Sequence, residues 1–409
     1  MRRAWHADWI YPGDGPPLRS GYVVTQGNVI QEICESPPLD AVIVQLESAV
    51  LMPPLVNAHT HLEFSGLCEP LEPRDQFADW IRTVINWRRS LSGPLTESIT
   101  EGIRESHSAG TGTIGEIDTS DWLAFPTPLV GTPLVVFREI LGLRPESISD
   151  QLAVARRHLT REVPGNITKG ISPHAPYSVH PDLFQQLMRM LRQCPRHCQS
   201  PLAMHLAESL DEIQLLSEGT GPLVNMLRDF GVWTPGLHAA GTRPLDFLKT
   251  LGEHLGPVLV IHGNYLNAAE IDFLAGHNNV SLVYCPRTHR GMGHQPHPWR
   301  ELLRRGIRVA IGTDGRCSNP DLSIWEELRL LSELAPDMTA SELLRLATWN
   351  GARALGVSER AGRLAHGMPG PILCATVSAD VLKNPQELLF QETLPAGAIQ
   401  LLPLLDSDS

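Results

Sequence analysis

The sequence contains very little lysine. Of its 33 basic residues only Lys169, Lys249 and Lys383 are lysines, and 45 acidic residues give the chain a net charge of −12. Binding to nucleic acid or to an anionic membrane surface depends on an excess of positive charge, which this chain lacks. We therefore expect no nucleic acid and no membrane among its partners.

Long hydrophobic runs and regularly spaced cysteines are also absent. No run reaches the ~18 apolar residues that a membrane span needs. The first residues include Arg2, Arg3, Asp8 and Asp14 where a signal peptide would have an apolar core. The seven cysteines are odd in number and scattered, which suits a reducing compartment better than a disulfide framework. These absences predict a cytoplasmic protein.

The composition is that of a globular protein with many loops: 42% of the residues are hydrophobic, and there are 34 glycines and 34 prolines. Short β-branched runs between Gly, Pro and Ser clusters predict strands near both ends of the chain. These runs are 21–25, 28–30, 41–44 and 372–377. We predict that residues 1–50 and 364–409 together form one small β domain.

The region between these segments alternates short apolar strands with helical stretches. The predicted strands are 55–59, 111–116, 134–137, 169–172, 202–205, 258–262, 281–284 and 308–311. The predicted helices include 75–91, 96–109, 182–193, 323–334 and 340–355. Eight strands with intervening helices indicate the α/β class and a distorted (β/α)8 TIM barrel over 51–363. An open doubly wound sheet is the alternative.

The motif His59-Thr60-His61 stands at the end of the first apolar strand. Residues i and i+2 of a strand point to the same side, so both imidazoles would face one centre at its carboxyl end. Neutral imidazole is a favoured nitrogen ligand of zinc and similar metals. On its own, the motif fits a metal site or a pair of histidines in a loop.

Three further polar residues recur at the same structural place. His205 and His262 end predicted strands, and Asp314 closely follows another. His61 and His205 are 144 residues apart, or four units of 36, and His262 and Asp314 are 52 apart, or two units of 26. A βαβ unit needs roughly 30 residues, and the carboxyl ends of barrel strands converge on the active site. The pattern therefore predicts that these residues meet at one metal site.

Four segments resemble motifs of the amidohydrolase superfamily, in the family's order: 56–63, 205–208, 261–263 and 312–319. The closer resemblance is to the branch that contains cytosine, guanine, S-adenosylhomocysteine and aminodeoxyfutalosine deaminases and triazine hydrolases. It covers nearly the whole chain, including a β domain built from both termini. The tail departs from the family pattern, because 367–372 lacks the acid of Gly-x-x-Ala-Asp-Leu. This departure leaves the extent of the small domain open.

The resemblance implies a metal site and its number of ions. The implied ligands are His59, His61, His205 and Asp314. Two-metal members of the superfamily bridge their ions with a carboxylated lysine at the end of the fourth strand. Here that strand ends near Ser172, and Lys169 comes too early on it. We expect one divalent metal, with Zn2+ first and Fe2+ or Mn2+ still open, because three histidines and an aspartate discriminate weakly among these ions.

The same resemblance implies a hydrolytic deaminase, in which a metal-bound hydroxide attacks an amino-bearing ring carbon and ammonia leaves. A catalytic metal lowers the pKa of its bound water from about 15.7 toward about 7. Asp314 would accept a hydrogen bond or proton from that water, and His262 would orient it. Glu208 would protonate the ring nitrogen beside the attacked carbon, a general acid–base role worth about 10²–10⁴-fold.

An aminopurine nucleoside-like molecule is the predicted substrate, with 6-aminodeoxyfutalosine as the leading candidate. Segments 57–65, 77–81 and 87–89 resemble the opening of that deaminase group. Trp80, with neighbouring phenylalanines, would offer an aromatic face to a flat base. The spacing of these aromatic residues equally suits the core face of a helix.

Other predicted substrate contacts come from two regions. Arg138, Glu139 and His174 lie near the ends of the third and fourth strands and could bind a carboxylate or ribose hydroxyls. The segment around His174 resembles one that brings a substrate-contacting histidine into deaminase pockets. His289 stands where many relatives carry Ser-Asn, and two histidines follow it. That cluster faces either the substrate or solvent.

Two alternative functions remain open. One is a hydrolase of another C–N or C–Cl bond, of the guanine, cytosine or triazine type. The other is a non-catalytic metal-binding relative, against which Glu208 and His262 argue, because neither is needed merely to hold a metal. A small-molecule substrate is the partner that we expect, and a homodimer stays open.

Overall fold

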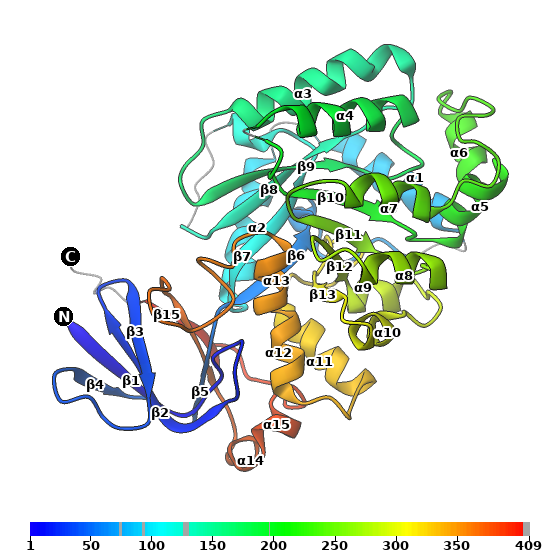
Figure 1. Cartoon of the computed structure of the whole chain (residues 1–409). Helices are drawn as coiled ribbons and strands as arrows, with labels where there is room; N and C mark the ends of the chain where they lie inside the picture. Colours follow the sequence, from blue (N-terminus) through cyan, green and yellow to red (C-terminus); the bar gives the residue numbers. More distant parts are fainter. Residues whose placement is uncertain (73–75, 92–94, 126–130, 196, 404–409) are drawn as a thin grey trace.

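The computed structural model describes residues 1–72, 76–91, 95–125, 131–195 and 197–403 (Figure 1). Eight parallel strands follow one another around one sheet in chain order. They are β6 (Leu55–Thr60), β7 (Thr111–Asp118), β8 (Leu134–Ile140), β9 (Ile167–Pro173), β10 (Leu202–Leu206), β11 (Val258–His262), β12 (Val280–Tyr284) and β13 (Arg308–Ile311). All eight predicted strands correspond to these elements.

The first and last strands of this sheet lie side by side, so the sheet is a nearly closed barrel. The backbone N–H groups of Thr313 and Asp314 each donate to the carbonyl of His59 over 3.1 Å. A side-chain contact supports the seam, because Asn57 Nδ2 donates to Thr313 Oγ1 over 2.7 Å. The predicted (β/α)8 barrel is thus confirmed, and the open doubly wound sheet was the wrong alternative.

Helices surround the barrel strands in Figure 1. They are α1 (Phe77–Ser90), α2 (Thr96–Ser108), α3 (Ile148–Thr160), α4 (Pro181–Gln193), α5 (Leu210–Glu218), α6 (Pro222–Asp229), α7 (Pro244–Gly252), α8 (Ala268–Ala275), α9 (Pro286–Gly291), α10 (Trp299–Arg304), α11 (Ile324–Leu334), α12 (Ala340–Leu346) and α13 (Trp349–Ala354). Short 3-10 turns are η1 (Leu62–Gly66), η2 (Trp122–Ala124) and η3 (Pro145–Ser147). Residue 75, where the first predicted helix begins, lies outside the described residues.

The single helix predicted over 340–355 is in fact two helices, α12 and α13. Thr348 separates them with a non-helical backbone, φ −131° and ψ −90°. Its hydroxyl donates to the carbonyl of Leu344 over 2.7 Å. A continuous apolar pattern does not reveal this break, because both helices bury their apolar faces.

The barrel interior is filled by side chains, and its amino-terminal end is closed. Val135, Phe137 and Ile261 belong to one buried cluster with Ala352 and Leu355 of the α13 region. The backbone N–H of Val56 also donates to the carbonyl of Ala347, over 2.7 Å. Only the carboxyl ends of the strands are therefore left to form a site, as is usual in this fold.

A second, smaller sheet takes strands from both ends of the chain. Its strands are β1 (Arg2–Ile10), β2 (Leu18–Gln26), β3 (Val29–Cys34), β4 (Val42–Gln45), β5 (Ala49–Met52), β14 (Ile372–Thr376) and β15 (Ile399–Leu402). β14 pairs antiparallel with β5, which joins the two terminal segments. Helices α14 (Ala379–Lys383) and α15 (Pro385–Leu388) lie between β14 and β15 in the chain. The small β domain built from both termini is confirmed as a fold.

Three strands of the small sheet, β1, β5 and β15, were not predicted. β1 pairs with β2, β4 and β5, although its sequence contains Arg2, Arg3, His6 and Asp8. Tertiary pairing here overrides a weak local pattern. The domain limits at residues 50 and 364 stay predictions, and residues 404–409 lie outside the described part of the chain.

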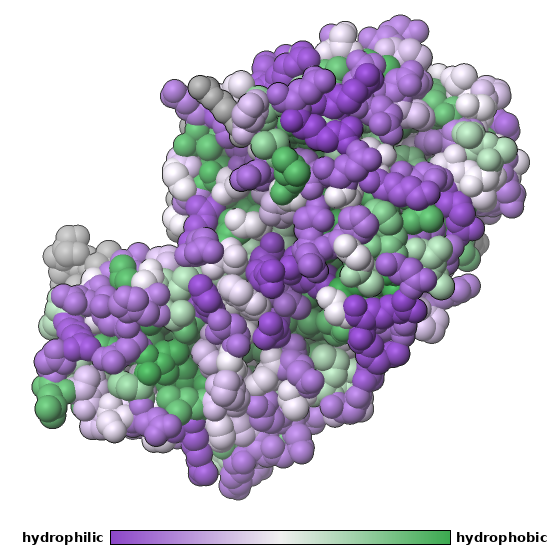
Figure 2. All heavy atoms as spheres, viewed as in Figure 1, coloured by the Kyte–Doolittle hydropathy of each residue, from purple (hydrophilic) through white to green (hydrophobic). Residues whose placement is uncertain are grey.

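The surface differs between the two parts of the molecule. In the view of Figure 2, hydrophilic side chains cover much of the outer barrel helices, and hydrophobic side chains gather over the small sheet. Within the described residues, no helix combines the length and apolar character that a membrane crossing requires. All seven cysteines are free, which agrees with the absence of a disulfide framework.

Candidate active site

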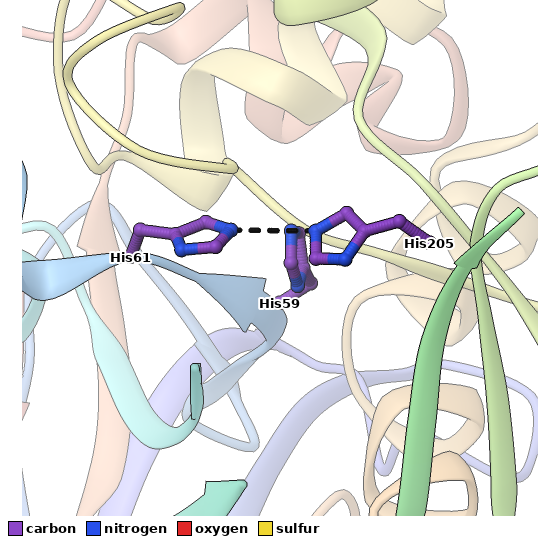
Figure 3. A group of neighbouring side chains, drawn as sticks. All are labelled: His59, His61 and His205. Carbon is purple, nitrogen blue, oxygen red and sulfur yellow. Dashed lines mark hydrogen bonds between the residues drawn. The ribbon is translucent and has the colours of Figure 1, made fainter. Parts of the chain in front are cut away.

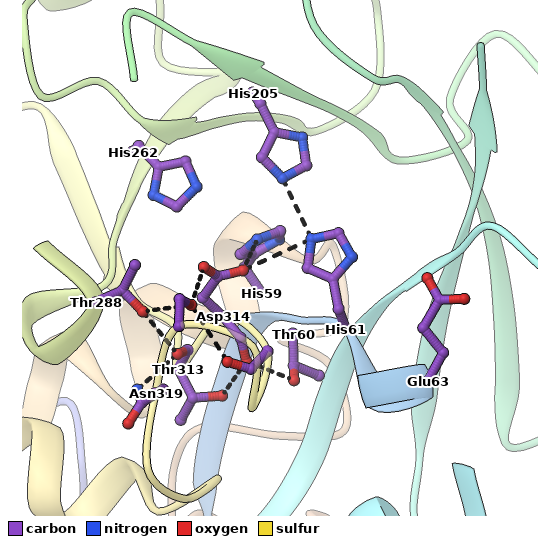
Figure 4. Close-up of polar contacts among 12 residues, drawn as sticks. His59, Thr60, His61, Glu63, His205, His262, Thr288, Thr313, Asp314 and Asn319 are labelled. Atoms are coloured by element: carbon purple, nitrogen blue, oxygen red, sulfur yellow. Dashed lines mark hydrogen bonds and ion pairs between the residues drawn. The ribbon is translucent and has the colours of Figure 1, made fainter. Parts of the chain in front are cut away.

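Four strand ends meet at the open end of the barrel. His59 lies on β6, His61 just beyond it, His205 on β10 and His262 at the end of β11, and Asp314 follows β13. Figure 3 shows His59, His61 and His205 turned toward one another, and Figure 4 adds His262 and Asp314 around the same point. All five residues are at most 9% exposed. The structure thus brings these residues together, as the sequence predicts.

The backbone at these strand ends is unusual. Ala207, His262 and Asp314 have positive φ angles of 54°, 65° and 58°. Residues other than glycine rarely adopt this left-handed conformation, which costs of order 1–3 kcal/mol and is frequent at functional sites. Ala207 follows β10, His262 ends β11, and Asp314 comes three residues after β13, so the chain changes direction where the side chains converge.

The nitrogen and oxygen atoms of the cluster are spaced like the ligands of one ion. His61 Nε2 lies 3.4 Å from His205 Nε2. Asp314 Oδ1 lies 3.4 Å from His59 Nε2 and 3.6 Å from His61 Nε2. Ligand bonds of about 2.0–2.1 Å in tetrahedral geometry separate neighbouring ligands by about 3.3–3.4 Å. The cluster therefore has the dimensions of a divalent metal site.

The protonation of the histidines also fits a metal. His205 Nδ1 faces the carbonyl of His174 at 3.2 Å, so that nitrogen carries the proton and Nε2 keeps its lone pair. Burial lowers the pKa of His61 to about 3. Buried His59 Nε2 has no hydrogen-bond partner among the described residues. Neutral imidazoles and an unsatisfied buried nitrogen are what a divalent cation would use.

Glu208 stands beside this cluster. Its Oε1 lies 3.5 Å from His262 Nε2, and burial raises its pKa well above the usual range, with Asp314 and Glu212 adding to the effect. The Glu212 carboxylate accepts the backbone N–H groups of Ala207 and Glu208, each over 2.9 Å. This turn holds the Glu208 carboxyl group at the edge of the cluster, where burial favours its uncharged form.

A pocket opens from the cluster and has one apolar and one polar wall. The apolar wall consists of Phe77, Trp80, Ile81, Val84 and Ile85 of α1 and Met226, Leu227 and Phe230 of the α6 region. The polar wall includes Arg88, Glu139, His174 and Ser178. His61, His205, Glu208, His262 and Asp314 also line this pocket. The arrangement suits a largely apolar ligand with a few polar groups.

The polar wall is a connected set of charged groups. Arg88 pairs with Glu63 and lies 3.2 Å from the Thr119 hydroxyl. The Thr119 hydroxyl donates to Glu139 Oε2 over 2.6 Å. Glu139 Oε1 is buried, has no hydrogen-bond partner among the described residues, and lies 3.7 Å from His174 Nε2. His174, Arg88 and His61 lower the pKa of Glu139 although burial opposes them.

The family model described as the amidohydrolase family matches residues 50–375. The chain belongs to the amidohydrolase family. Family membership confirms the expected class of enzyme, a hydrolase that acts on carbon–nitrogen bonds.

The similar proteins match most of the length of this amidohydrolase chain. An aminodeoxyfutalosine deaminase of Deinococcus radiodurans is 29% identical over 373 residues, which is 85% of this chain and 84% of that protein. A 5-methylthioadenosine/S-adenosylhomocysteine deaminase of Desulforamulus reducens is 27% identical over 351 residues, 81% of this chain and 73% of that one. The structure of Helicobacter pylori aminofutalosine deaminase has a TM-score of 0.79 at 23% identity and covers 98% of both chains.

Two predicted substrate contacts of this amidohydrolase do not reach the pocket. Arg138 points the other way on β8, where its Nη1 donates to the carbonyl of Asp118 over 3.1 Å. Successive strand residues point to opposite faces, so Glu139 enters the pocket and Arg138 cannot. His289 bonds the carbonyl of Gln295 through Nε2 over 2.8 Å and is absent from the pocket lining. His174, Glu139 and Trp80 do line it.

Ile81, Val84 and Arg88 of α1 and the α6 wall line the amidohydrolase pocket but were not assigned from sequence. On α1 they share a face with Phe77 and Trp80. A helical spacing of i, i+3, i+4, i+7 and i+11 would indicate that face, but it cannot tell a pocket wall from a core contact. Phe77 and Trp80, 9% and 8% exposed, combine both roles. The α6 wall left no signal, because only tertiary packing brings it opposite α1.

Proposed function

We propose that this amidohydrolase is a metal-dependent hydrolytic deaminase of an aminopurine nucleoside-like substrate, with 6-aminodeoxyfutalosine as the leading candidate. The observation that carries the proposal is a buried acid, Glu208, placed between a His/Asp metal cluster and an apolar pocket. The named deaminases among the similar proteins support the choice of an adenosine-like substrate.

His59, His61, His205 and Asp314 would hold one divalent ion, with zinc as the first choice and iron or manganese as alternatives. When bound, such an ion supplies a Lewis acid that lowers the pKa of a coordinated water toward neutrality. The chain contributes neutral imidazoles and a carboxylate whose pKa His59, His61 and His262 hold low against the effect of burial. Asp314 is thus able to accept a hydrogen bond or a proton from the attacking water.

Glu208 and His262 would handle the protons of the reaction. Burial raises the pKa of Glu208 and so favours its protonated form, which could donate to the ring nitrogen beside the attacked carbon. Burial lowers the pKa of His262 to about 3, and its neutral ring can orient the water. After attack, the Glu208 carboxylate can receive the water's proton and return it to the departing amine.

Each wall of the pocket would contact a different part of the substrate. The aromatic and aliphatic side chains of α1 and the α6 region would pack on the flat base and on an apolar substituent. The free Oε1 of Glu139 would accept hydrogen bonds from ribose hydroxyls, and His174 Nε2 lies beside it. Arg88 lines the pocket and would bind a substrate carboxylate in place of Arg138.

The test is a panel of amino compounds incubated with purified, metal-loaded enzyme. The panel contains 6-aminodeoxyfutalosine, adenosine, 5-methylthioadenosine, S-adenosylhomocysteine, guanine and cytosine. We expect ammonia release and the ultraviolet shift from aminopurine to oxopurine, with the highest kcat/KM for 6-aminodeoxyfutalosine. A preference for a pyrimidine or a triazine, without turnover of any aminopurine, would overturn the substrate and leave the metal chemistry in place.

A further inference from the structure

Three histidines follow β12, His289, His294 and His297, and one of them bonds an active-site residue. His289 and His294 bond the carbonyl of Gln295 and the Tyr265 hydroxyl, respectively. His297 is different, because its Nε2 lies 2.8 Å from the backbone carbonyl of His262. Its ring stacks on Tyr284, with centroids 4.1 Å apart and 23° between the planes. His297 therefore bonds the backbone of the active-site residue His262 from outside the pocket.

The hydrogen bonds of His297 determine which nitrogen carries its proton. The backbone N–H of Trp299 can only donate, and it lies 2.9 Å from His297 Nδ1. The His262 carbonyl can only accept. A neutral ring with the proton on Nε2 satisfies both partners, and burial, which lowers the pKa of His297 to about 3, favours the neutral form. We assign this tautomer.

The carbonyl that His297 holds belongs to a strained residue. His262 has a φ of 65°, and Gly263 after it has a φ of 63°. Two successive left-handed residues turn the chain sharply at the end of β11. This turn directs the His262 ring to Glu208 Oε1, 3.5 Å away, and into one group with His59 and Asp314.

The other two left-handed residues at the strand ends are held in a similar way. The carbonyl of Ala207 accepts the backbone N–H of Tyr265 over 3.0 Å, and the carbonyl of Asp314 accepts the Thr60 hydroxyl over 2.9 Å. In each case a group from another segment bonds the carbonyl of the strained residue. At His262 this group is the imidazole of His297.

We propose that His297 is a positioning residue: by donating from Nε2 to the His262 carbonyl, it maintains the turn that aims His262 at Glu208 and Asp314. The proposal deepens the proposed function and rests on it only for the kinetic test. His297 itself does not line the pocket among the described residues. Its loss should therefore impair the chemical step more than substrate binding.

The test compares three variants. His297→Phe keeps a flat ring for Tyr284 but has no donor, and we expect kcat to fall about 10- to 100-fold, with KM within about threefold and metal content unchanged. His297→Gln keeps an N–H that can reach the carbonyl and should retain most of the wild-type kcat. His294→Phe removes an imidazole of the same histidine group. His294 bonds no residue of the metal site, so the kcat of this variant should stay within about twofold of the wild-type value.

A crystal structure of each variant gives a readout that needs no substrate. In His297→Phe we expect His262 to lose its left-handed φ or its ring to move away from Glu208, and in His294→Phe we expect neither. Wild-type kcat together with an unmoved His262 in His297→Phe would overturn the proposal. If that variant does not fold, the same readouts on His297→Gln and His297→Met decide, because the two side chains are similar in length and only Gln donates. Failure of the wild-type enzyme on the whole panel would refute the proposed function, and the crystallographic comparison would still test His297.

Discussion

His61 Nε2 and His205 Nε2 face each other across 3.4 Å, although 144 residues separate them in the chain. Two buried, neutral ring nitrogens gain little from this approach unless one donates to the other or a cation lies between them. Because His205 Nδ1 donates to a carbonyl, its Nε2 presents a lone pair. The contact therefore joins β6 and β10 at the proposed metal position.

This relationship predicts the metal content of the protein. We expect about one divalent ion per chain in the wild type and a large loss of metal in His61→Ala, because one of four ligands is removed. The exposed His366, which bonds the carbonyl of Gln31, provides the control, and His366→Ala should keep its metal. Elemental analysis is the measurement. Active protein without a transition metal, or two firmly held ions, would contradict the prediction.

A second prediction separates proton transfer from metal binding. Glu208→Gln removes the acidic proton but keeps the size of the side chain, so the variant should retain its metal and lose kcat by at least about 10²-fold. Glu218→Gln, at the exposed end of α5, should behave like the wild type. Steady-state kinetics with metal analysis on the same samples measures both effects. Near-normal turnover of Glu208→Gln would remove Glu208 from the mechanism.

A third prediction uses two adjacent residues of β8 that point in opposite directions. Glu139→Gln takes a charged acceptor from the pocket, and we expect KM to rise about tenfold or more, the value of a hydrogen bond to a charged group. Arg138→Gln weakens the contact with Asp118 outside the pocket. It should lower the melting temperature and leave KM within about twofold. The opposite pattern would show that Arg138, not Glu139, meets the substrate.

A fourth prediction concerns the barrel core. Phe137 is 1% exposed and lies in the cluster that fills the barrel interior. Phe137→Ala should reduce the free energy of unfolding by about 3–5 kcal/mol, through lost burial and the cavity left behind. Leu334→Ala, at a side chain that is 52% exposed, should change it by no more than about 0.5 kcal/mol. Denaturant unfolding of the three proteins makes the comparison, and equal midpoints would contradict the assignment of this core.

The sequence by itself predicted the barrel and the polar residues that converge at the carboxyl ends of its strands. Most barrel strands contain a short apolar run, and His59, His205 and His262 stand at the ends of such runs, where a period of two and the rules of parallel βα units place them together. Local pattern was sufficient for strands such as β8 and β11, because burial on both sides leaves a continuous apolar signal in them.

Tertiary structure alone decided the surroundings of the cluster. Whether Trp80 faces a ligand or a core, and whether Arg88 replaces Arg138 as the pocket cation, depends on how α1 and α6 pack, which no local spacing encodes. β1 escaped prediction because its pairing partners, not its own residues, make it a strand. The proposed role of His297 likewise could not be predicted from the sequence, because the carbonyl that it bonds belongs to a residue 35 positions earlier in the chain.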